Sequence, residues 1–338
     1  MGRTGRYLAA AGVLAAGLAL LPSLKTAARA PAATGASDPF SPRLVARFAA
    51  GTRSDDAAVI EDAGPAGAVV LAQANLRRAL VLDMASGRVL AAIPLPTGAR
   101  HVAVDPILRR IYLPDEHSNT LRVVSYAQGW GRLSARAVPV GRVPHAAAVD
   151  PRTHRVYVTD ENDNAVSIVD GAMRSVAQTV PVGRLPGGIA LDPRAGIVYV
   201  AVVLENRVVM IDAATGRVLR SARVGREPTH LAADPTAGRA YVTNTTGSTL
   251  SAVDGARGTA APPVAVGTQP YNVVADGARG LIAVASSNSP FLRLLDARTL
   301  RVRRVVTLDV VPRALGIDPR RRLLIVGGNE PRVEAYAY

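Results

Sequence analysis

Three of the chain's five histidines stand at one recurring position of the sequence. Each precedes a repeated aspartate by four or five residues, as His101 precedes Asp105. Other repeats carry polar side chains there, and the candidate ligand-binding residues are Arg100, His101, His145, His230, Tyr271, Asn272 and Arg313. Imidazole nitrogens bind divalent metals, and the other side chains bind polar or anionic ligands. We expect a metal or small-ligand site where the fold brings this position together.

Two acidic segments complete a candidate metal set. Asp115 opens the segment DEH and Asp160 opens the segment DEND. The candidate metal ligands are therefore His101, His145, His230, Asp115 and Asp160. A bound metal would act as a Lewis acid while a histidine or carboxylate moved the proton. The alternative is a hydrated polar rim without a ligand, because spacing alone does not place three histidines in one coordination sphere.

The repeated aspartate defines the organisation of the chain. It occurs at Asp62, Asp105, Asp150, Asp192, Asp234, Asp276 and Asp318. The intervals are 42 to 45 residues, and proline follows the aspartate directly in five of the seven repeats. An Asp-Pro pair favours a tight turn. A constant period of this length is typical of a repeat protein, in which each unit buries its apolar face against its neighbours.

Each repeat is expected to form four strands. The best-preserved unit, residues 140–182, contains the short β-rich runs HAAAV, RVYVT, AVSIV and SVAQTV. None of the intervening pieces has the length or period of a helix. Seven antiparallel units of four strands predict an all-β fold, a seven-bladed β-propeller.

The second strand of the repeat carries a more specific motif. The segments VYVTD, AYVTN, VYVAV and IYLPD each follow an Asp-Pro turn and precede a third strand ending in VD, ID or VS. In this respect residues 43–338 resemble the YVTN family of seven-bladed propellers. The resemblance implies an exported binding protein, since members occur in periplasms and on cell surfaces and many have no assigned reaction. The tyrosines of these segments are expected in the core: Tyr112, Tyr157, Tyr199 and Tyr241.

The two ends of the chain have separate predicted roles. The last repeat stops at Tyr338, one strand short, and residues 43–50 could supply that strand and close the ring. Residues 1–30 carry arginines before a fifteen-residue apolar run, which indicates a secretory signal or, alternatively, an uncleaved anchor. Residues 31–42 are expected to be a linker. We therefore expect a periplasmic or otherwise secreted protein with no transmembrane span in the mature chain.

Arginine gathers on the face opposite the histidines. The formal net charge is +14, and turns between first and second strands are rich in arginine. The candidate polyanion-binding residues are Trp130, Arg132, Arg152, Arg155, Arg320, Arg321 and Arg322. Guanidinium groups bind phosphate and an indole stacks on bases, so single-stranded DNA is a candidate partner. The alternative is a solvated basic face, on which His154 is simply exposed.

Composition and missing motifs limit the function. The absence of cysteine excludes disulfides, thiol nucleophiles and thiolate metal sites. There is no G-x-S-x-G, HExxH or phosphate-binding glycine loop, and no catalytic residue is assigned. We expect a monomeric, non-catalytic recognition propeller for a protein or small, anionic ligand, with no cofactor required and a divalent metal as the candidate. One alternative is a metal-dependent lactonase- or lyase-like enzyme. It would use the funnel, which is the mouth of the central channel that His101, His145, His230 and the other candidate ligand-binding residues should surround. The other alternative is binding of single-stranded DNA or an anionic surface by the arginine face.

Overall fold

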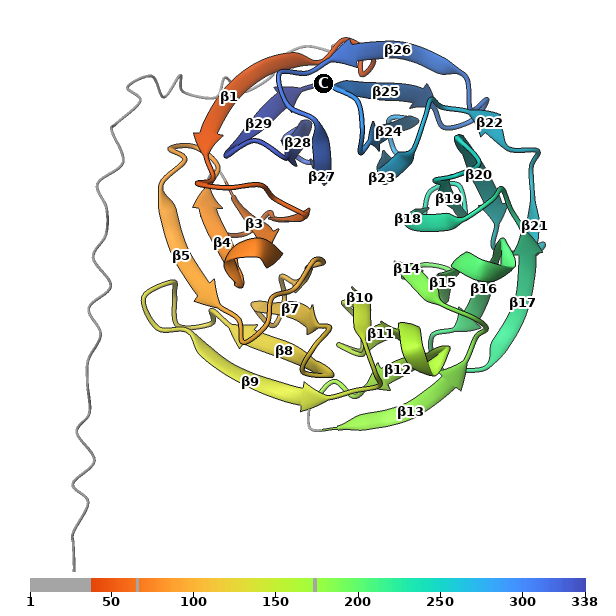
Figure 1. The fold of residues 1–338 in the computed structure, drawn as a ribbon, viewed down its shortest axis with the longest axis horizontal. Coiled ribbons are helices and arrows are strands. Elements are labelled where there is room, and N and C mark those ends of the chain that lie inside the picture. Colours follow the sequence, from red (N-terminus) through yellow and green to blue (C-terminus); the bar gives the residue numbers. More distant parts are fainter. Residues whose placement is uncertain (1–37, 65–66, 173–174) are drawn as a thin grey trace, which may run out of the picture.

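The computed structural model describes residues 38–64, 67–172 and 175–338. These residues form a ring of seven antiparallel sheets (Figure 1). The innermost strands of the ring surround a central cavity, which is called the channel below. The predicted all-β, seven-bladed fold is confirmed. The predicted export signal, residues 1–30, and residues 31–37 of the predicted linker lie outside the described residues.

The blades follow one another along the chain. Blade one consists of β2 (Asp56–Ile60), β3 (Ala68–Gln73), β4 (Arg78–Asp83) and β5 (Val89–Pro94). Blade two consists of β6 (Ala103–Asp105), β7 (Arg110–Asp115), β8 (Thr120–Ser125) and β9 (Ser134–Pro139). Blade three consists of β10 (Pro144–Val149), β11 (Val156–Asp160), β12 (Ala165–Val169) and β13 (Val176–Pro181). Blade four consists of β14 (Pro186–Asp192), β15 (Ile197–Val202), β16 (Arg207–Asp212) and β17 (Val218–Arg223).

The remaining blades vary at their outer edges. Blade five consists of β18 (Pro228–Asp234), β19 (Arg239–Asn244), β20 (Thr249–Asp254), β21 (Thr259–Ala260) and β22 (Val264–Ala265). Its outer strand is split where Pro262 and Pro263 offer no backbone N–H. Blade six consists of β23 (Pro270–Asp276), β24 (Leu281–Ser286), β25 (Phe291–Asp296) and β26 (Val302–Thr307). Blade seven consists of β27 (Pro312–Asp318), β28 (Leu323–Gly328), β29 (Arg332–Ala337) and β1 (Arg43–Ala49).

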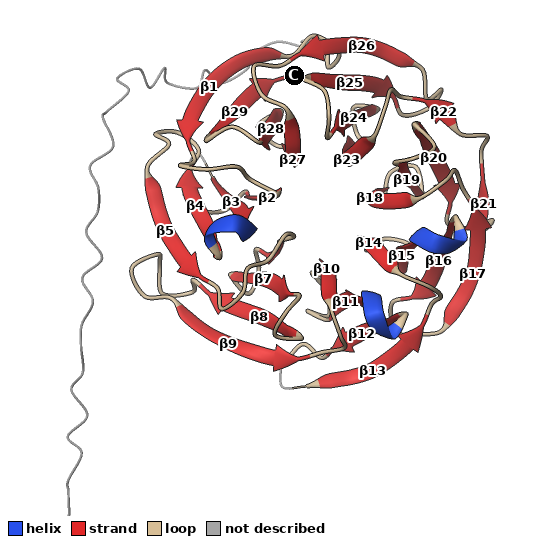
Figure 2. Ribbon diagram, viewed as in Figure 1, coloured by secondary structure: helices blue, strands red, loops and turns tan. Residues whose placement is uncertain are grey.

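Among the described residues, helical structure is confined to single turns. Figure 2 shows three short 3₁₀ helices between second and third strands. They are η1 (Ala74–Leu76), η2 (Glu161–Asp163) and η3 (Val203–Glu205). Within the described part of the chain, no helix has the length and apolar character needed to cross a bilayer.

The N-terminal strand closes the ring. β1 pairs antiparallel with β29, so that Arg43 lies opposite Ala337 and Phe48 lies opposite Val333. Arg47 bonds Glu334, whose side chain is fully buried, at 3.0 Å. The predicted closure by residues 43–50 is therefore confirmed, and it removes the open edge of the last blade.

The repeat motif explains the packing between blades. The four tyrosines predicted to be core are completely buried. The Tyr157 hydroxyl donates to the Ala213 carbonyl of the next blade at 2.6 Å, and the Tyr241 hydroxyl donates to the Ala297 carbonyl at 3.2 Å. Each of these two tyrosines thus fills the core and also ties its blade to the following one.

The repeated aspartates are turn formers in most blades. Asp192 accepts from the backbone N–H groups of Arg194 and Ala195 at 2.8 and 3.0 Å. Asp62 of blade one departs from this role, since the hydrogen bond described for it comes from Arg320. It lies two residues beyond β2, so the repeat of blade one is not in register with the others.

Candidate metal centre in the central funnel

The innermost strands carry the histidines to the channel. His145 and His230 lie near the starts of β10 and β18, and His101 lies just before β6. The antiparallel register shifts between Pro144 and Ala147 and between Pro228 and Leu231, so both of these histidines sit in bulges. A bulge re-aims a side chain out of the regular alternation.

The structure brings the three histidines together. One ring nitrogen from each of His101, His145 and His230 lies within 4.8 Å of the others. The Nε2 atoms of His101 and His230 are 3.5 Å apart, and the rings of His101 and His145 have centroids 4.5 Å apart. Three imidazoles around one point are a ligand set for a borderline divalent metal such as Zn²⁺.

Blade four leaves room for this convergence. Where blades two, three and five carry histidine, blade four carries Gly187 and Gly188. A Cβ at Gly188 would lie 2.5 Å from the carbonyl oxygen of Thr229. Glycine therefore lets blade four approach blade five closely, and the two glycine positions place no side chain between the histidines of blades three and five.

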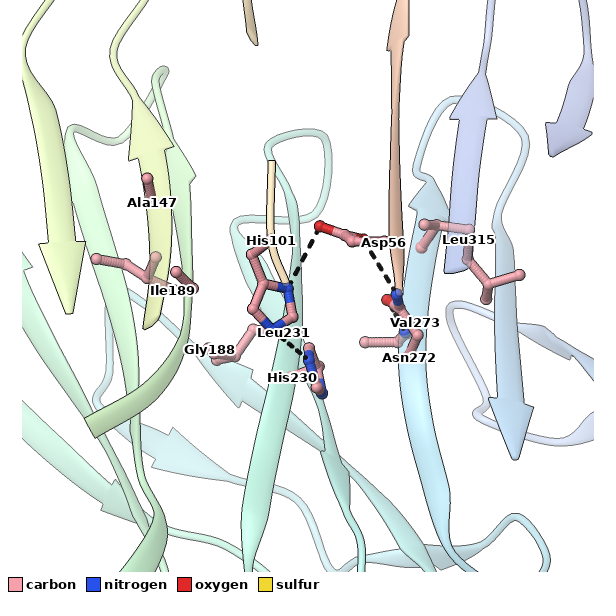
Figure 3. Close-up of a pocket in the computed structure, with 12 residues that line it drawn as sticks. Asp56, His101, Ala147, Gly188, Ile189, His230, Leu231, Asn272, Val273 and Leu315 are labelled. Carbon is pink, nitrogen blue, oxygen red and sulfur yellow. Dashed lines mark hydrogen bonds and ion pairs between the residues drawn. The ribbon is translucent and has the colours of Figure 1, made fainter. Parts of the chain in front are cut away.

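Carboxylates lie beside the Nδ1 atoms of two of the three imidazole rings. Nδ1 of His101 is 3.3 Å from Asp56 Oδ2, and Nδ1 of His145 is 3.1 Å from Glu161 and 3.5 Å from Glu116. Figure 3 shows His101 between Asp56 and His230, with Asp56 also bonded to Asn272. A carboxylate on Nδ1 fixes the ring and directs Nε2 toward a metal.

Burial sets the charge state of His101 and His230. Desolvation lowers the pKa of both well below the usual value. The neighbouring imidazoles lower it further, His145 acting on His101, and His101 followed by His145 acting on His230. Both rings are therefore neutral near pH 7, which is the form that binds metals. Desolvation also raises the pKa of Asp56 to about 6.

The pKa values of the two glutamates beside His145 are shifted in opposite directions. Burial raises the pKa of Glu161. Burial also works against ionisation of Glu116, but hydrogen bonding to His145 and the charge of Arg100 lower its pKa overall. The cluster thus contains groups that can accept or donate protons beside the three imidazoles.

The predicted carboxylate ligands lie elsewhere. Asp115 accepts a hydrogen bond from Thr97, and Asp160 accepts one from the Ser167 hydroxyl at 2.6 Å. Both side chains are fully buried, and neither belongs to the group of ligand atoms around the histidines. The residue after each aspartate, Glu116 or Glu161, reaches His145 instead.

The remaining predicted ligand residues surround the histidines. The Tyr271 ring packs on His230 with centroids 4.3 Å apart, and the Arg313 guanidinium lies 4.9 Å from the Tyr271 ring centre. Arg100 reaches Glu116 at 3.5 Å. Asn272 donates to the backbone carbonyl of Arg313 at 3.2 Å. The sequence position four or five residues before the repeated aspartate therefore maps onto one site.

The repeat spacing did not identify Asp56 as a residue of the site. It lies six residues before Asp62, and Asp62 is displaced relative to the aspartates of the other blades. Alignment of blade one on its apolar run AAVI would have placed Asp56 near the histidine position. The site therefore draws side chains from blades one, two, three, five, six and seven.

A cavity adjoins the histidines inside the channel. It has a volume of about 170 Å³ and is lined by Asp56, His101, His230 and Asn272 together with Gly188 and apolar side chains (Figure 3). The apolar lining includes Ile189, Leu231 and Leu315. This space accommodates a few non-hydrogen atoms of a ligand or several waters.

On the opposite face, the structure shows partners for most of the predicted polyanion-binding arginines. Arg320 bonds Asp62 at 2.9 Å, Arg321 bonds Asp318 at 2.8 Å, and Arg152 lies 3.6 Å from Asp150. Arg155 donates to the backbone carbonyl of Ala214 at 2.5 Å. Arg132 is exposed, and Arg322 occupies a turn with left-handed backbone.

Two further residues of this face, Trp130 and His154, contact neighbouring side chains and are not simply exposed. Trp130 stacks on Tyr126 with centroids 4.5 Å apart and an interplanar angle of 12°, so one indole face is covered. The expectation that His154 is simply exposed is wrong. Its Nδ1 lies 2.7 Å from the buried carboxylate of Asp105, because the turn brings the two blades together there.

Comparison with known proteins gives no assignment. No protein-family model matches the chain, and no curated protein matches it at a significant level. The functional argument therefore depends on the geometry of the funnel.

Proposed function

We propose that this chain is a recognition propeller that binds one divalent transition-metal ion through His101, His145 and His230 and holds a small ligand on that ion. The proposal rests on the convergence of three imidazole nitrogens within 4.8 Å of one another. Carboxylates also lie beside Nδ1 of His101 and His145. Nitrogen ligands favour zinc, copper or nickel over magnesium or calcium, which prefer oxygen. We take zinc as the reference ion.

Metal titration tests this proposal. Protein purified and stripped with a chelator is expected to bind one Zn²⁺ per chain and to melt at a higher temperature when loaded, because only the folded state assembles the site. Removal of the ion by chelator should reverse the shift. Binding of less than about 0.1 ion per chain at saturating free zinc would contradict the proposal.

Membership of the YVTN family and export are parts of the same proposal. They are supported by the VYVTD and AYVTN segments and by the apolar N-terminal run. Expression of the full chain in a Gram-negative host should yield a periplasmic protein shortened by about 30 residues. A full-length product retained in the membrane would instead indicate the uncleaved anchor.

Metal-dependent catalysis is a second candidate. Three protein ligands leave at least one coordination position for water or substrate, which is typical of catalytic rather than structural zinc sites. Glu161 and Glu116 contact Nδ1 of His145 and would orient that ring toward the ion. A panel of lactones tested with the zinc-loaded and the metal-free protein would support this candidate only if hydrolysis required the metal.

A further inference from the structure

We infer that the funnel metal is flanked by an oxyanion-binding subsite made by Arg313, Tyr271 and Arg100, and that the ligand is a small organic acid. This inference depends on the proposed metal site. The acid would place one carboxylate on the arginines and a second oxygen on the ion. Dicarboxylates and hydroxy acids have this arrangement of donors.

Arg313 has hydrogen-bonding capacity left over. Its side chain is 25% exposed, and its closest carboxylate, Asp55, is 3.8 Å from Nε. The Nε atom is buried and has no hydrogen-bond partner among the described residues. Asp55 is already held by Arg53 at 3.3 Å and by the backbone N–H of Ala74 at 3.1 Å. A buried donor without an acceptor is rare in folded proteins and favours a ligand that supplies one.

Tyr271 connects Arg313 to the metal ligands. Its ring lies against His230 on one side and under the Arg313 guanidinium on another. Stacking of this kind fixes the plane of the guanidinium and so prepares it for bidentate contact with a carboxylate. No hydrogen bond to the Tyr271 hydroxyl is found within the described segments, and this half-buried group can donate to the same ligand.

Arg100 adds a second cation to the same space. Its side chain is 55% exposed, and within the described segments its ion pair is a 3.5 Å approach to Glu116. Arg100 directly precedes the ligand His101 in the chain, and the same oxygen of Glu116 is 3.5 Å from Nδ1 of His145. Arg100 therefore lies at the edge of the histidine cluster.

The size and charge of the site limit the ligand. The cavity beside His101 and His230 has a volume of about 170 Å³, which suits a ligand part of a few non-hydrogen atoms. The ion and the two arginines supply positive charge, and an anion that bridges them satisfies both. Arginine binds planar carboxylates in a bidentate fashion, which favours an organic acid over a spherical anion.

Calorimetry on the zinc-loaded protein tests the subsite. Zinc stoichiometry is measured first, and malonate, neutral malonamide and inorganic phosphate are then titrated as probes. We expect malonate to bind, malonamide not to bind, and Arg313→Gln to weaken malonate binding about tenfold or more while zinc stays at one per chain. Arg313→Lys should recover part of the loss, because it restores the charge without the guanidinium fork.

Matched controls separate the possible failures. Arg298→Gln changes an exposed arginine on the opposite face and should leave malonate binding unchanged. Equal malonate affinity of wild type and Arg313→Gln would overturn the subsite while leaving the metal site intact. Tighter binding of phosphate than of malonate would overturn the organic acid as ligand. Failure of zinc to bind would overturn the proposed function and the subsite together.

Discussion

Turn aspartates of the arginine face and buried aspartates near the funnel have pKa values shifted in opposite directions. On the arginine face, turn carboxylates are stabilised as anions: hydrogen bonds from Thr215 lower the pKa of Asp212, and hydrogen bonds from Thr299 lower that of Asp296. At the funnel, burial raises the pKa of Asp56 and Asp160 to about 6. Ionisation of Asp212 and Asp296 therefore stabilises the fold, whereas ionisation of the buried Asp56 and Asp160 costs stability. Glu116 is an exception at the funnel, because His145 and Arg100 lower its pKa.

The contrast shows that partners matter more than the number of charges. On the arginine face, Arg321 donates to a carboxylate of its own turn, and Arg320 and Arg155 donate to a carboxylate or carbonyl of the neighbouring blade. The funnel, by contrast, contains three close imidazoles and, among the described residues, a buried guanidinium nitrogen without a hydrogen-bond partner. Costly arrangements of this kind are characteristic of functional sites.

Loss of one histidine is expected to have the largest effect. His101→Ala removes one of three ligands and should weaken zinc affinity at least about 100-fold in competition with a fluorescent chelator. His117→Ala is the matched control, because His117 is an exposed histidine outside the cluster. Equal affinity of the two variants would mean that zinc does not bind at the funnel.

Replacement of a buried acid should raise stability. Asp160→Asn reproduces blade five, where Asn244 donates to the Ser251 hydroxyl at 3.0 Å. Because the folded-state pKa of Asp160 is raised to about 6, its contribution to stability is complete below the unfolded value of 3.8 and is lost as the pH rises through 6. The variant should therefore gain about 3 kcal/mol in free energy of unfolding at pH 7 and little at pH 4, measured by urea denaturation.

Asp212, an acid of the arginine face, is the control for Asp160, because its effect on stability should have the opposite sign. The pKa of Asp212 is lowered by Thr215, so its contribution is present above the unfolded value and is lost as the pH falls. Asp212→Asn should therefore destabilise the protein at pH 7, and the difference from wild type should shrink on acidification. The same sign for both variants would refute the contrast between the faces.

Removal of the carboxylate that orients the His145 ring should have a smaller effect on zinc affinity than loss of a histidine. Glu161→Gln retains the size of the side chain but removes the charge beside His145 Nδ1, and zinc affinity should fall about tenfold. Glu205→Gln provides the control, because Glu205 occupies the corresponding 3₁₀ turn of blade four and bonds Arg207. Equal losses in both variants would point to a general electrostatic effect.

The smallest effect is expected on the arginine face. Arg152→Ala combined with Arg320→Ala should change affinity for single-stranded DNA less than about twofold, because exposed ion pairs with the turn acids already engage these groups. Filter binding over a range of salt concentrations measures this. A large loss that also reduces the salt dependence would identify this face as a polyanion reader after all.

The fold could be predicted because its signals are local and repeated. The Asp-Pro turns and the buried tyrosines of the second strands recur with the period of a blade, so each repeat supports the assignment of the others. The closure by β1 followed from the missing strand of the last blade. Blade one was less regular, and the displacement of Asp62 hid the register of β2.

The site could be predicted only in part. Spacing identified His101, His145 and His230, because equivalent positions of the innermost strands meet at the channel. Spacing could not show which of two adjacent acids turns toward a histidine, and it favoured Asp160 where Glu161 makes the contact. That choice depends on side-chain direction at the end of a strand, which the tertiary structure determines.

X-ray absorption spectroscopy of the protein loaded with one equivalent of zinc tests the central claim most directly. We predict three imidazole nitrogens at about 2.0 Å, with the remaining position filled by water or an added carboxylate. The His101→Ala protein should lose this signature. A first shell made of oxygen atoms alone, or one unchanged in that variant, would contradict the assignment of the funnel as a metal site.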